Sequence, residues 1–111
     1  MEIATTQYKQ CDMAKVTGRI DSFTAPQLSD TLHGFTDQGR YKILLDLTDV
    51  SYVSSAGLRV MIDIQKICKQ SNRGEVVLVC VPQRIYETLE LAGFVPLFKF
   101  YDDVSAAVDG F

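Results

Sequence analysis

The sequence predicts an α/β fold, a mixed sheet of about five strands packed by about four helices. Residues 43–45 and 76–81 are continuous apolar runs, which are typical of central strands covered on both faces. Between them, residues 56–71 place apolar side chains at helical spacing, which indicates an amphipathic crossover helix. Residues 13–18 alternate apolar and polar side chains, as a strand with one solvated face does. We expect residues 1–111 to form a single domain.

The chain is expected to open with a β-hairpin. Residues 2–9 form its first predicted strand and residues 13–18 its second. Cys11 and Asp12 lie between these two segments and are expected at the turn.

A first helix is predicted to begin after Thr24. Thr24 and Gln27 match a capping box, and Pro26 suits the first helical turn because its nitrogen needs no hydrogen bond there. Gly39 follows the last periodic residue and is expected to end the helix. The apolar residues at helical spacing are Ala25, Leu28, Leu32 and Phe35.

The second half of the chain is expected to alternate strands and helices. The strand that begins at residue 43 is predicted to end at Leu47, and a short polar loop then leads to the 56–71 helix. The remaining expected elements are a strand over 76–81, a helix over 83–92 ended by Gly93, a strand over 97–100 and a terminal helix capped by Asp102 and Asp103.

Composition and charge narrow the possible functions. The chain has 47% hydrophobic and 23% charged residues, as globular proteins do, and its net charge of −3 argues against nucleic-acid binding. We find neither a signal-peptide pattern nor an apolar run long enough to span a membrane. The three cysteines are far apart, without a Cys-x-x-Cys pair, which suits a reducing compartment. We therefore expect a cytoplasmic protein that contacts neither nucleic acid nor membrane directly.

The most informative segment is the start of the 56–71 helix, where the chain reads Ser54, Ser55, Ala56 and Gly57. A serine there lies beside the free N–H groups and the positive dipole end of the helix. That position accommodates a phosphate, so the serine is a candidate phosphate acceptor. The alternative is an ordinary serine N-cap, which the local pattern alone favours.

The same helix carries two apolar residues that its core face does not require. With about 100° per residue, Leu58 and Ile62 fall in the sector of Ser55, between the core and polar faces. They indicate either a partner surface beside the serine or a broad buried face. The expected core face comprises Val60, Met61, Ile64, Ile67 and Cys68, and the polar face Arg59, Asp63 and Lys66.

Residues 18–24 are predicted to form a loop between the second strand and the first helix. Asp21 in this loop either contributes to a site or satisfies N–H groups of the loop, and taken alone the second role is favoured. The loop would approach Ser55 if both loops leave the sheet at one edge.

Catalytic constellations are scarce. His33 is the only histidine, and the chain lacks a Gly-x-Ser-x-Gly motif and a glycine-rich phosphate loop. Asp46, Asp49 and Asp63 could be grouped as a metal cluster, but Asp46 and Asp49 are interpreted as loop-capping groups. We expect no enzyme activity, cofactor or metal, and a phosphotransfer enzyme that uses His33 is the most distant alternative.

The order of elements and four segments together resemble the STAS domain, specifically the stand-alone bacterial anti-sigma factor antagonists. The segments are residues 18–21, 44–47, 50–58 and 89–94, and the resemblance extends over essentially the whole chain. It implies the STAS fold, and it implies a binding module that is switched by phosphorylation.

In that family, a serine at the start of the second helix is phosphorylated by a partner that is both anti-sigma factor and serine kinase. The unphosphorylated form binds this partner and frees the sigma factor, and a metal-dependent serine phosphatase reverses the modification. By position, Ser55 matches the phosphate acceptor and Asp21 an acidic residue near the partner interface. The expected partner surface comprises Asp21, Ser54, Ser55, Leu58, Arg59 and Ile62.

The chain departs from the best-known members at two positions. Ser54 replaces an aspartate, and Ala56 replaces a second hydroxyl residue. The missing acid removes a negative charge beside the acceptor, so kinase recognition is expected to differ, and Ser54 stays an alternative acceptor to Ser55. The alternative function is that of an unphosphorylated STAS scaffold or ligand-sensing module in another signalling pathway.

Overall fold

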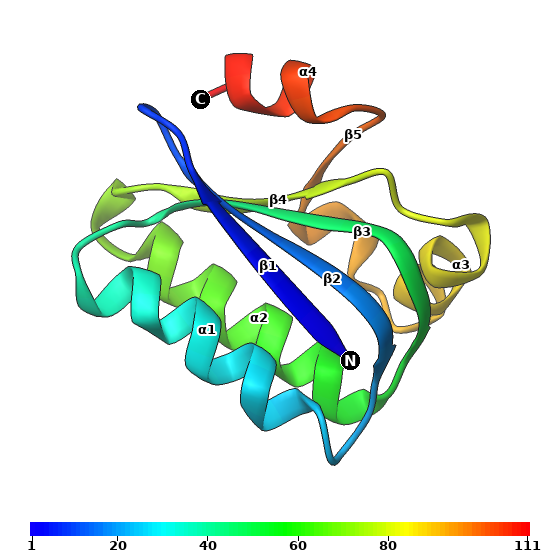
Figure 1. The fold of residues 1–111 in the computed structure, drawn as a ribbon. Coiled ribbons are helices and arrows are strands. Elements are labelled where there is room, and N and C mark those ends of the chain that lie inside the picture. Colours follow the sequence, from blue (N-terminus) through cyan, green and yellow to red (C-terminus); the bar gives the residue numbers. More distant parts are fainter.

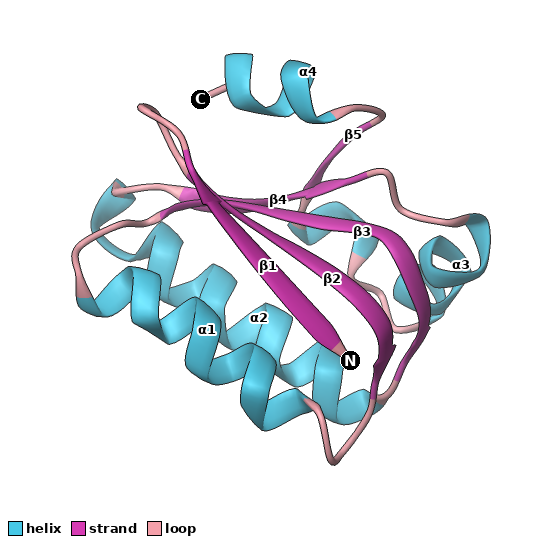
Figure 2. Cartoon of the chain, viewed as in Figure 1, coloured by secondary structure: helices cyan, strands magenta, loops and turns pink.

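The computed structural model describes residues 1–111, except the side chain of Ser71, and it contains one sheet with helices on both faces (Figures 1 and 2). The strands are β1 (Glu2–Gln7), β2 (Asp12–Ile20), β3 (Lys42–Val53), β4 (Glu75–Val79) and β5 (Lys99–Tyr101). The α-helices are α1 (Ala25–Asp37), α2 (Ser55–Lys69), α3 (Gln83–Leu91) and α4 (Val104–Asp109). Two short 3₁₀ helices are η1 (Gln70–Asn72) and η2 (Val95–Leu97).

The five strands lie in chain order across the sheet. β1 pairs antiparallel with β2, and the pairs β2–β3, β3–β4 and β4–β5 are parallel. Parallel neighbours need a crossover connection, and α1, α2 and α3 each lie in one of these connections. The predicted mixed sheet with four α-helices is thus confirmed for the part of the chain that the structure describes.

The sheet separates two apolar cores. α1, α2 and α3 cover one face and contribute to the larger core, whereas α4 covers part of the opposite face (Figure 1). Ile43 and Leu45 of β3 belong to the larger core, and Leu44 between them belongs to the smaller core with Val77 of β4. Successive strand residues point to opposite faces, so burial of both faces explains the continuous apolar runs in the sequence.

The hairpin turn lies earlier in the chain than predicted. The backbone N–H of Tyr8 donates a hydrogen bond of 2.8 Å to the carbonyl of Cys11, which closes the turn before β2 begins. Cys11 and Asp12, which were expected at the turn, are both buried. Burying the Asp12 carboxylate requires a partner, and Arg40 in the loop after α1 forms an ion pair with it. This long-range ion pair compensates the charge of the buried carboxylate.

Helix α1 begins where predicted, but the predicted capping box is wrong. The Thr24 hydroxyl donates to the carbonyl of Arg19 at 2.8 Å and accepts from the backbone N–H of Asp21 at 2.8 Å. It therefore closes the β2–α1 loop and forms no capping hydrogen bond with the helix. Gly39 follows the helix as predicted, at a φ of +76° that is unfavourable for residues with a Cβ.

Strand β3 is longer than predicted. Residues 48–53, expected as a loop, continue the strand, and the register against β2 shifts within this part. Asp46 and Asp49 consequently lie in the strand and not in a loop. The Asp46 carboxylate accepts hydrogen bonds from the backbone N–H and the hydroxyl of Thr48, at 3.0 and 2.6 Å, and Asp49 pairs with Lys15 at 3.6 Å. The register shifts disturb the alternation by which sequence patterns reveal strands.

The C-terminal elements are confirmed with shifted boundaries. β4 ends at Val79, before the predicted end at residue 81, because Cys80 adopts a left-handed φ of +53°. β5 covers Lys99–Tyr101, since the residues just before it form η2. Gly93, at a φ of +77°, follows α3 as predicted. Asp103 caps α4 by accepting a 2.7 Å hydrogen bond from the backbone N–H of Ala106.

Helix α2 buries a side that differs from the prediction at three positions. Val60 and Ile67, expected in the core, are half-buried. Gln65, which the helical projection places beside Leu58 and Ile62 between the core and polar faces, is buried. The buried residues of the helix are Gly57, Met61, Ile64, Gln65 and Cys68. None of the described helices is long and apolar enough to cross a membrane.

Candidate functional site

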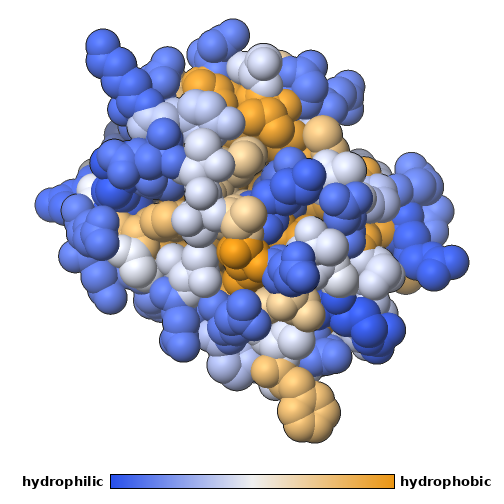
Figure 3. Space-filling model, viewed as in Figure 1, coloured by the Kyte–Doolittle hydropathy of each residue, from blue (hydrophilic) through white to orange (hydrophobic). Residues whose placement is uncertain are grey.

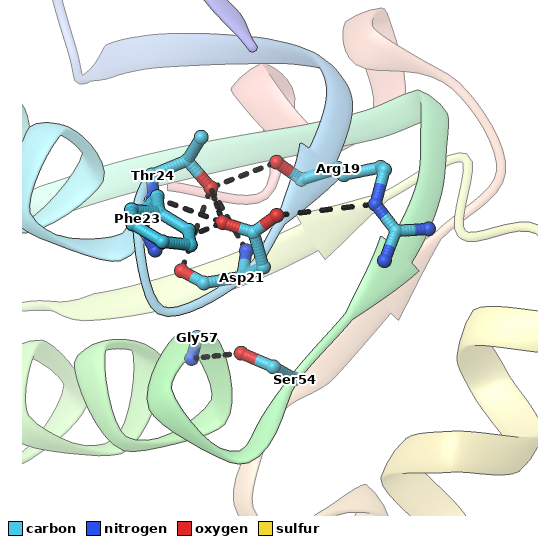
Figure 4. Close-up of polar contacts among 6 residues, drawn as sticks. All are labelled: Arg19, Asp21, Phe23, Thr24, Ser54 and Gly57. Atoms are coloured by element: carbon cyan, nitrogen blue, oxygen red, sulfur yellow. Dashed lines mark hydrogen bonds and ion pairs between the residues drawn. The ribbon is translucent and has the colours of Figure 1, made fainter.

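Two loops of the predicted site leave the sheet at the same edge. β2 and β3 are parallel neighbours, and Ile20 at the end of β2 lies opposite Val53 at the end of β3. The backbone N–H of Ser54 donates a hydrogen bond of 2.8 Å to the carbonyl of Ile20. The β2–α1 loop that holds Asp21 and the junction between β3 and α2 are therefore held next to each other (Figure 4).

The two adjacent serines have different roles at the start of α2. Ser54 is the N-cap, with an extended backbone, and its hydroxyl oxygen accepts a hydrogen bond of 3.3 Å from the N–H of Gly57 (Figure 4). Ser55 is the first helical residue and is exposed. The N-cap interpretation thus applies to Ser54, and the hydroxyl of Ser55 is accessible for modification.

Gly57 lets the first turn of α2 approach the sheet closely. A Cβ at this position would lie 2.6 Å from Cγ2 of Ile20 and 3.1 Å from Cγ1 of Val53. Both neighbours are buried and branched at Cβ, so they have little freedom to move aside. The glycine of the Ser-Ser-Ala-Gly segment therefore has a packing role that sets the position of both serines.

A groove of about 480 Å³ begins at Ser55 and follows one face of α2. The helix residues that line it have the spacing of a single face, and the segment after α3 forms the rest of the lining. The lining residues are Ser55, Leu58, Arg59, Ile62, Asp63, Lys66, Ala92 and Phe94, and we call this feature the α2 groove. The structure thus brings Ser55, Leu58 and Ile62 together, as the helical projection predicted. Arg59, which the projection assigned to the polar face, lines the same groove.

Leu58 and Ile62 are half-buried, and both pack against the larger core. The sequence left two possibilities open for them, a partner surface or a broad buried face. Each side chain combines the two, because it contacts the core and also lines the α2 groove. Phe94 completes the apolar part of the lining, and the sequence analysis missed it because the segment after α3 is far from α2 in the chain.

Asp21 organises the β2–α1 loop. Its Oδ1 atom accepts hydrogen bonds from the backbone N–H groups of Thr24 at 3.1 Å and Phe23 at 2.9 Å (Figure 4). Its Oδ2 atom lies 3.9 Å from Nε of Arg19. The hydrogen bond from Thr24 N–H, followed by the one from Phe23 N–H, lowers the pKa of the Asp21 carboxyl. Of the two roles predicted for Asp21, its contacts show the second one, in which it satisfies N–H groups of the loop.

The β2–α1 loop and the end of β2 before it present an aromatic and a cationic side chain that the sequence did not single out. Phe23 in this loop is a large apolar residue, yet it is 92% exposed. Arg19 places its guanidinium carbon 4.4 Å from the ring centroid of Tyr52, a cation–π contact on the neighbouring strand. An aromatic residue inside an otherwise polar loop segment was the available signal for Phe23.

The other candidate residues lie apart from this site. His33 is half-buried on α1, and its Nδ1 atom donates to the carbonyl of Ser29 at 2.8 Å. Among the described residues, no three His, Cys, Asp or Glu side chains are grouped so that they could hold a metal, so Asp46, Asp49 and Asp63 form no such cluster. Burial raises the pKa of the Cys68 thiol to about 11, which keeps that thiol protonated at neutral pH.

Comparison with known proteins identifies the family. The STAS domain family matches residues 2–107 of the chain. BtrV of Bordetella bronchiseptica, assigned by name to the anti-sigma factor antagonists, is 34% identical over 99 residues, which are 89% of this chain and 84% of BtrV. The anti-sigma-B factor antagonist of Staphylococcus aureus is 30% identical over 97 residues, which are 87% of this chain and 89% of that protein.

Solved structures share the fold. An anti-sigma factor antagonist of Thermotoga maritima superimposes with a TM-score of 0.90 at 23% identity, covering 97% of this chain and 92% of that one. SpoIIAA of Bacillus superimposes in its unphosphorylated form with a TM-score of 0.84 and in its phosphorylated form with 0.77, at 12% and 13% identity. These alignments cover 98% of this chain, and 95% and 98% of the respective SpoIIAA chains. The chain therefore belongs to the STAS domain family, among the anti-sigma factor antagonists.

Proposed function

We propose that this protein is a cytoplasmic anti-sigma factor antagonist that acts as a phosphorylation switch. Its unphosphorylated form binds an anti-sigma factor that is also a serine kinase, and this binding releases the sigma factor. Phosphorylation of Ser55 blocks binding, and a metal-dependent serine phosphatase restores it. The observation that carries the proposal is the position of Ser55, an exposed hydroxyl at the end of the α2 groove.

Charge explains how a phosphate on Ser55 would prevent binding. A phosphoserine carries a charge of about −1.5 to −2 at neutral pH. In the complex, that charge would lie beside Leu58 and Ile62 in a surface from which the partner excludes water. Burying a charge costs binding free energy even when a neighbouring charge pairs with it, because the desolvation penalty can exceed the Coulombic gain. The helix itself tolerates the phosphate, because its N-terminal dipole favours negative charge.

Arg59 adds a second effect of phosphorylation. It lies one helical turn after Ser55 and lines the same groove. An anionic residue followed four positions later by a cationic one is a favourable pair on a helix. A phosphate on Ser55 would therefore pair with Arg59 and remove this cation from the surface that the partner meets.

The acceptor is tested by incubating the protein with the anti-sigma factor kinase of the same organism and ATP, and mapping the phosphate by mass spectrometry. We expect phosphate on Ser55 in the wild type and in Ser54→Ala, and none in Ser55→Ala. Stoichiometric phosphate on Ser54 while Ser55 is intact would refute the assignment. If the protein binds the kinase but is never phosphorylated, the scaffold alternative gains support. If an acid-labile phosphate is found on His33, the phosphotransfer-enzyme alternative gains support.

The switch is tested with Ser55→Asp. We expect this variant to keep its free energy of unfolding within roughly 1 kcal/mol of the wild type, because acidic residues suit a helix start. Its affinity for the anti-sigma factor should nevertheless fall, whereas the uncharged Ser55→Asn should retain more of it. If Ser55→Asp unfolds, the serine has a structural role and the switch loses its support.

The α2 groove is tested with the pair Ile62→Ser and Ile64→Ser. Ile64 is fully buried, and truncating such a side chain costs about 2–5 kcal/mol of folding stability. Ile62 is half-buried, so its loss should lower the urea midpoint less while weakening partner binding. Equal destabilisation by the two substitutions would assign Ile62 to the core alone and remove it from the partner surface.

A further inference from the structure

We infer that Phe23 is an anchor of the partner surface, whose ring enters an apolar pocket of the anti-sigma factor, and that Asp21 is a positioning residue for it. This inference rests on the proposed function, and it assigns to the β2–α1 loop a contact that is separate from the α2 groove.

The first observation is the exposure of the Phe23 ring. Phe23 is 92% exposed, whereas Phe98 is buried and the other four phenylalanines of the chain are half-buried. In Figure 3, an apolar side chain stands out at the lower edge, where the β2–α1 loop lies in Figure 1. The ring adds nothing to the packing of the fold, so its apolar surface is available to a partner. Because single exposed apolar residues are common, exposure alone does not identify an anchor.

The second observation is that hydrogen bonds fix the backbone of the loop that carries the ring. The Asp21 carboxylate binds the backbone N–H groups of both Phe23 and Thr24, and the N–H of Ala25 donates to the carbonyl of Asp21 at 2.8 Å. The Thr24 hydroxyl closes the loop onto Arg19. An aromatic side chain on an ordered backbone loses little conformational entropy on binding, and this favours interface anchors.

The third observation is continuity with the α2 groove. The 2.8 Å hydrogen bond from Ser54 N–H to the Ile20 carbonyl joins the base of this loop to the start of α2. Gly57 packs directly against Ile20, so the loop and the first turn of the helix form one unit. A protein that covers Ser55 therefore also reaches this loop. The same partner, the anti-sigma factor, would bind the Phe23 ring in an apolar pocket of its own.

The chain offers a direct probe, because it contains no tryptophan. A Phe23→Trp variant is titrated with the anti-sigma factor of the same organism, in a form whose own tryptophans are replaced. On binding, we expect the tryptophan emission to shift to shorter wavelength and its quenching by acrylamide to decrease. Phe111→Trp is the control, since Phe111 packs on the smaller core across the sheet, and its emission should not change. A complex in which the emission of the Phe23→Trp variant stays that of an exposed side chain overturns the inference.

Affinity provides the second measurement. Phe23→Ser should raise the Kd about thirtyfold or more, the size of effect seen at interface hot spots, with no change in the urea midpoint. If the wild type does not bind the anti-sigma factor, the proposed function fails and the inference with it. If the wild type binds, Ser55→Asp does not, and Phe23→Ser binds like the wild type, only the inference is overturned.

Two substitutions of Asp21 distinguish a positioning role from a direct charge contact with the partner. Asp21→Asn keeps a carbonyl oxygen for the N–H groups of Phe23 and Thr24, so it should bind nearly as well as the wild type. Asp21→Ala should weaken binding, and it should have no further effect in a Phe23→Ser background, because coupled residues are not additive. If Asp21→Asn and Asp21→Ala lose the same affinity, and lose it also in the Phe23→Ser background, Asp21 contacts the partner directly. That result would overturn the positioning role.

Discussion

The backbone N–H of Ser54 lies 2.8 Å from the carbonyl oxygen of Ile20 and donates a hydrogen bond to it. This bond joins the end of β2 to the cap of α2, so the β2–α1 loop and the α2 groove share one support. Gly57, in the first turn of the helix, lies against the same isoleucine. The backbone at Ser55 is therefore fixed by contacts of the residues before and after it in the chain.

Gly57→Ala should destabilise the protein although alanine is the better helix former. The added Cβ would lie 2.6 Å from Cγ2 of Ile20, and overpacking of this kind costs about 1–3 kcal/mol. Gly34→Ala on α1 is the matched control, because nothing lies within 4 Å of its added Cβ. There the substitution should stabilise by up to about 1 kcal/mol, the difference in helix propensity. Urea unfolding of both variants checks the prediction, and two stabilised proteins would show that the contact at position 57 relaxes freely.

Ser54→Ala and Ser55→Ala should differ in stability. Ser54 caps α2 through the 3.3 Å bond to Gly57 N–H, and removing an N-cap costs typically about 1 kcal/mol. Ser55 is exposed, so its replacement should stay within about 0.5 kcal/mol of the wild type. Thermal and urea unfolding measure the two differences. The reverse order of stabilities would mean that Ser55 is the cap and Ser54 the available hydroxyl.

Gln65→Leu should be strongly destabilising. The buried Gln65 side chain accepts from the N–H of Val76 at 2.7 Å and donates to the carbonyls of Val76 at 3.1 Å and Leu97 at 2.8 Å. Leucine would leave these backbone groups without the amide, and each unsatisfied buried group costs about 1–3 kcal/mol. The urea midpoint measures the loss, with the exposed Gln27→Leu on α1 as a control expected within about 0.5 kcal/mol. A Gln65→Leu variant as stable as the control would show that water replaces the amide.

The Asp21 carboxyl should titrate below its ordinary pKa of 3.8 in the folded protein, because it accepts hydrogen bonds from Thr24 and Phe23 N–H. A pKa that is lower in the folded state stabilises the fold above the unfolded value, and this contribution disappears as the pH falls through the folded pKa. Asp21→Asn should therefore lose less stability than the wild type as the pH falls below 3.8. Carboxyl chemical shifts measured against pH give the pKa, and a value at or above 3.8 would contradict the loop geometry.

Local sequence patterns were sufficient to predict the order and type of the helices and strands. The apolar runs of β3 and β4, the helical periodicity of α1 and α2, and the glycines after α1 and α3 are local signals, decided within a few residues. The sequence likewise placed Leu58 and Ile62 on the helix sector of Ser55, because helix geometry alone relates residues three and four apart.

Which polar groups form hydrogen bonds with one another depends on how the elements pack together. The Thr24 hydroxyl closes a loop instead of capping α1, because the carbonyl of Arg19 and the N–H of Asp21 lie within its reach. Gln65 is buried because two segments distant in the chain bring backbone groups to its amide. The sequence did not specify which serine is the N-cap of α2. In the structure Ser54 is the cap, and the carbonyl of Ile20 on the neighbouring strand accepts a hydrogen bond from its backbone N–H. Such contacts depend on the packing of separate elements, which no local pattern encodes.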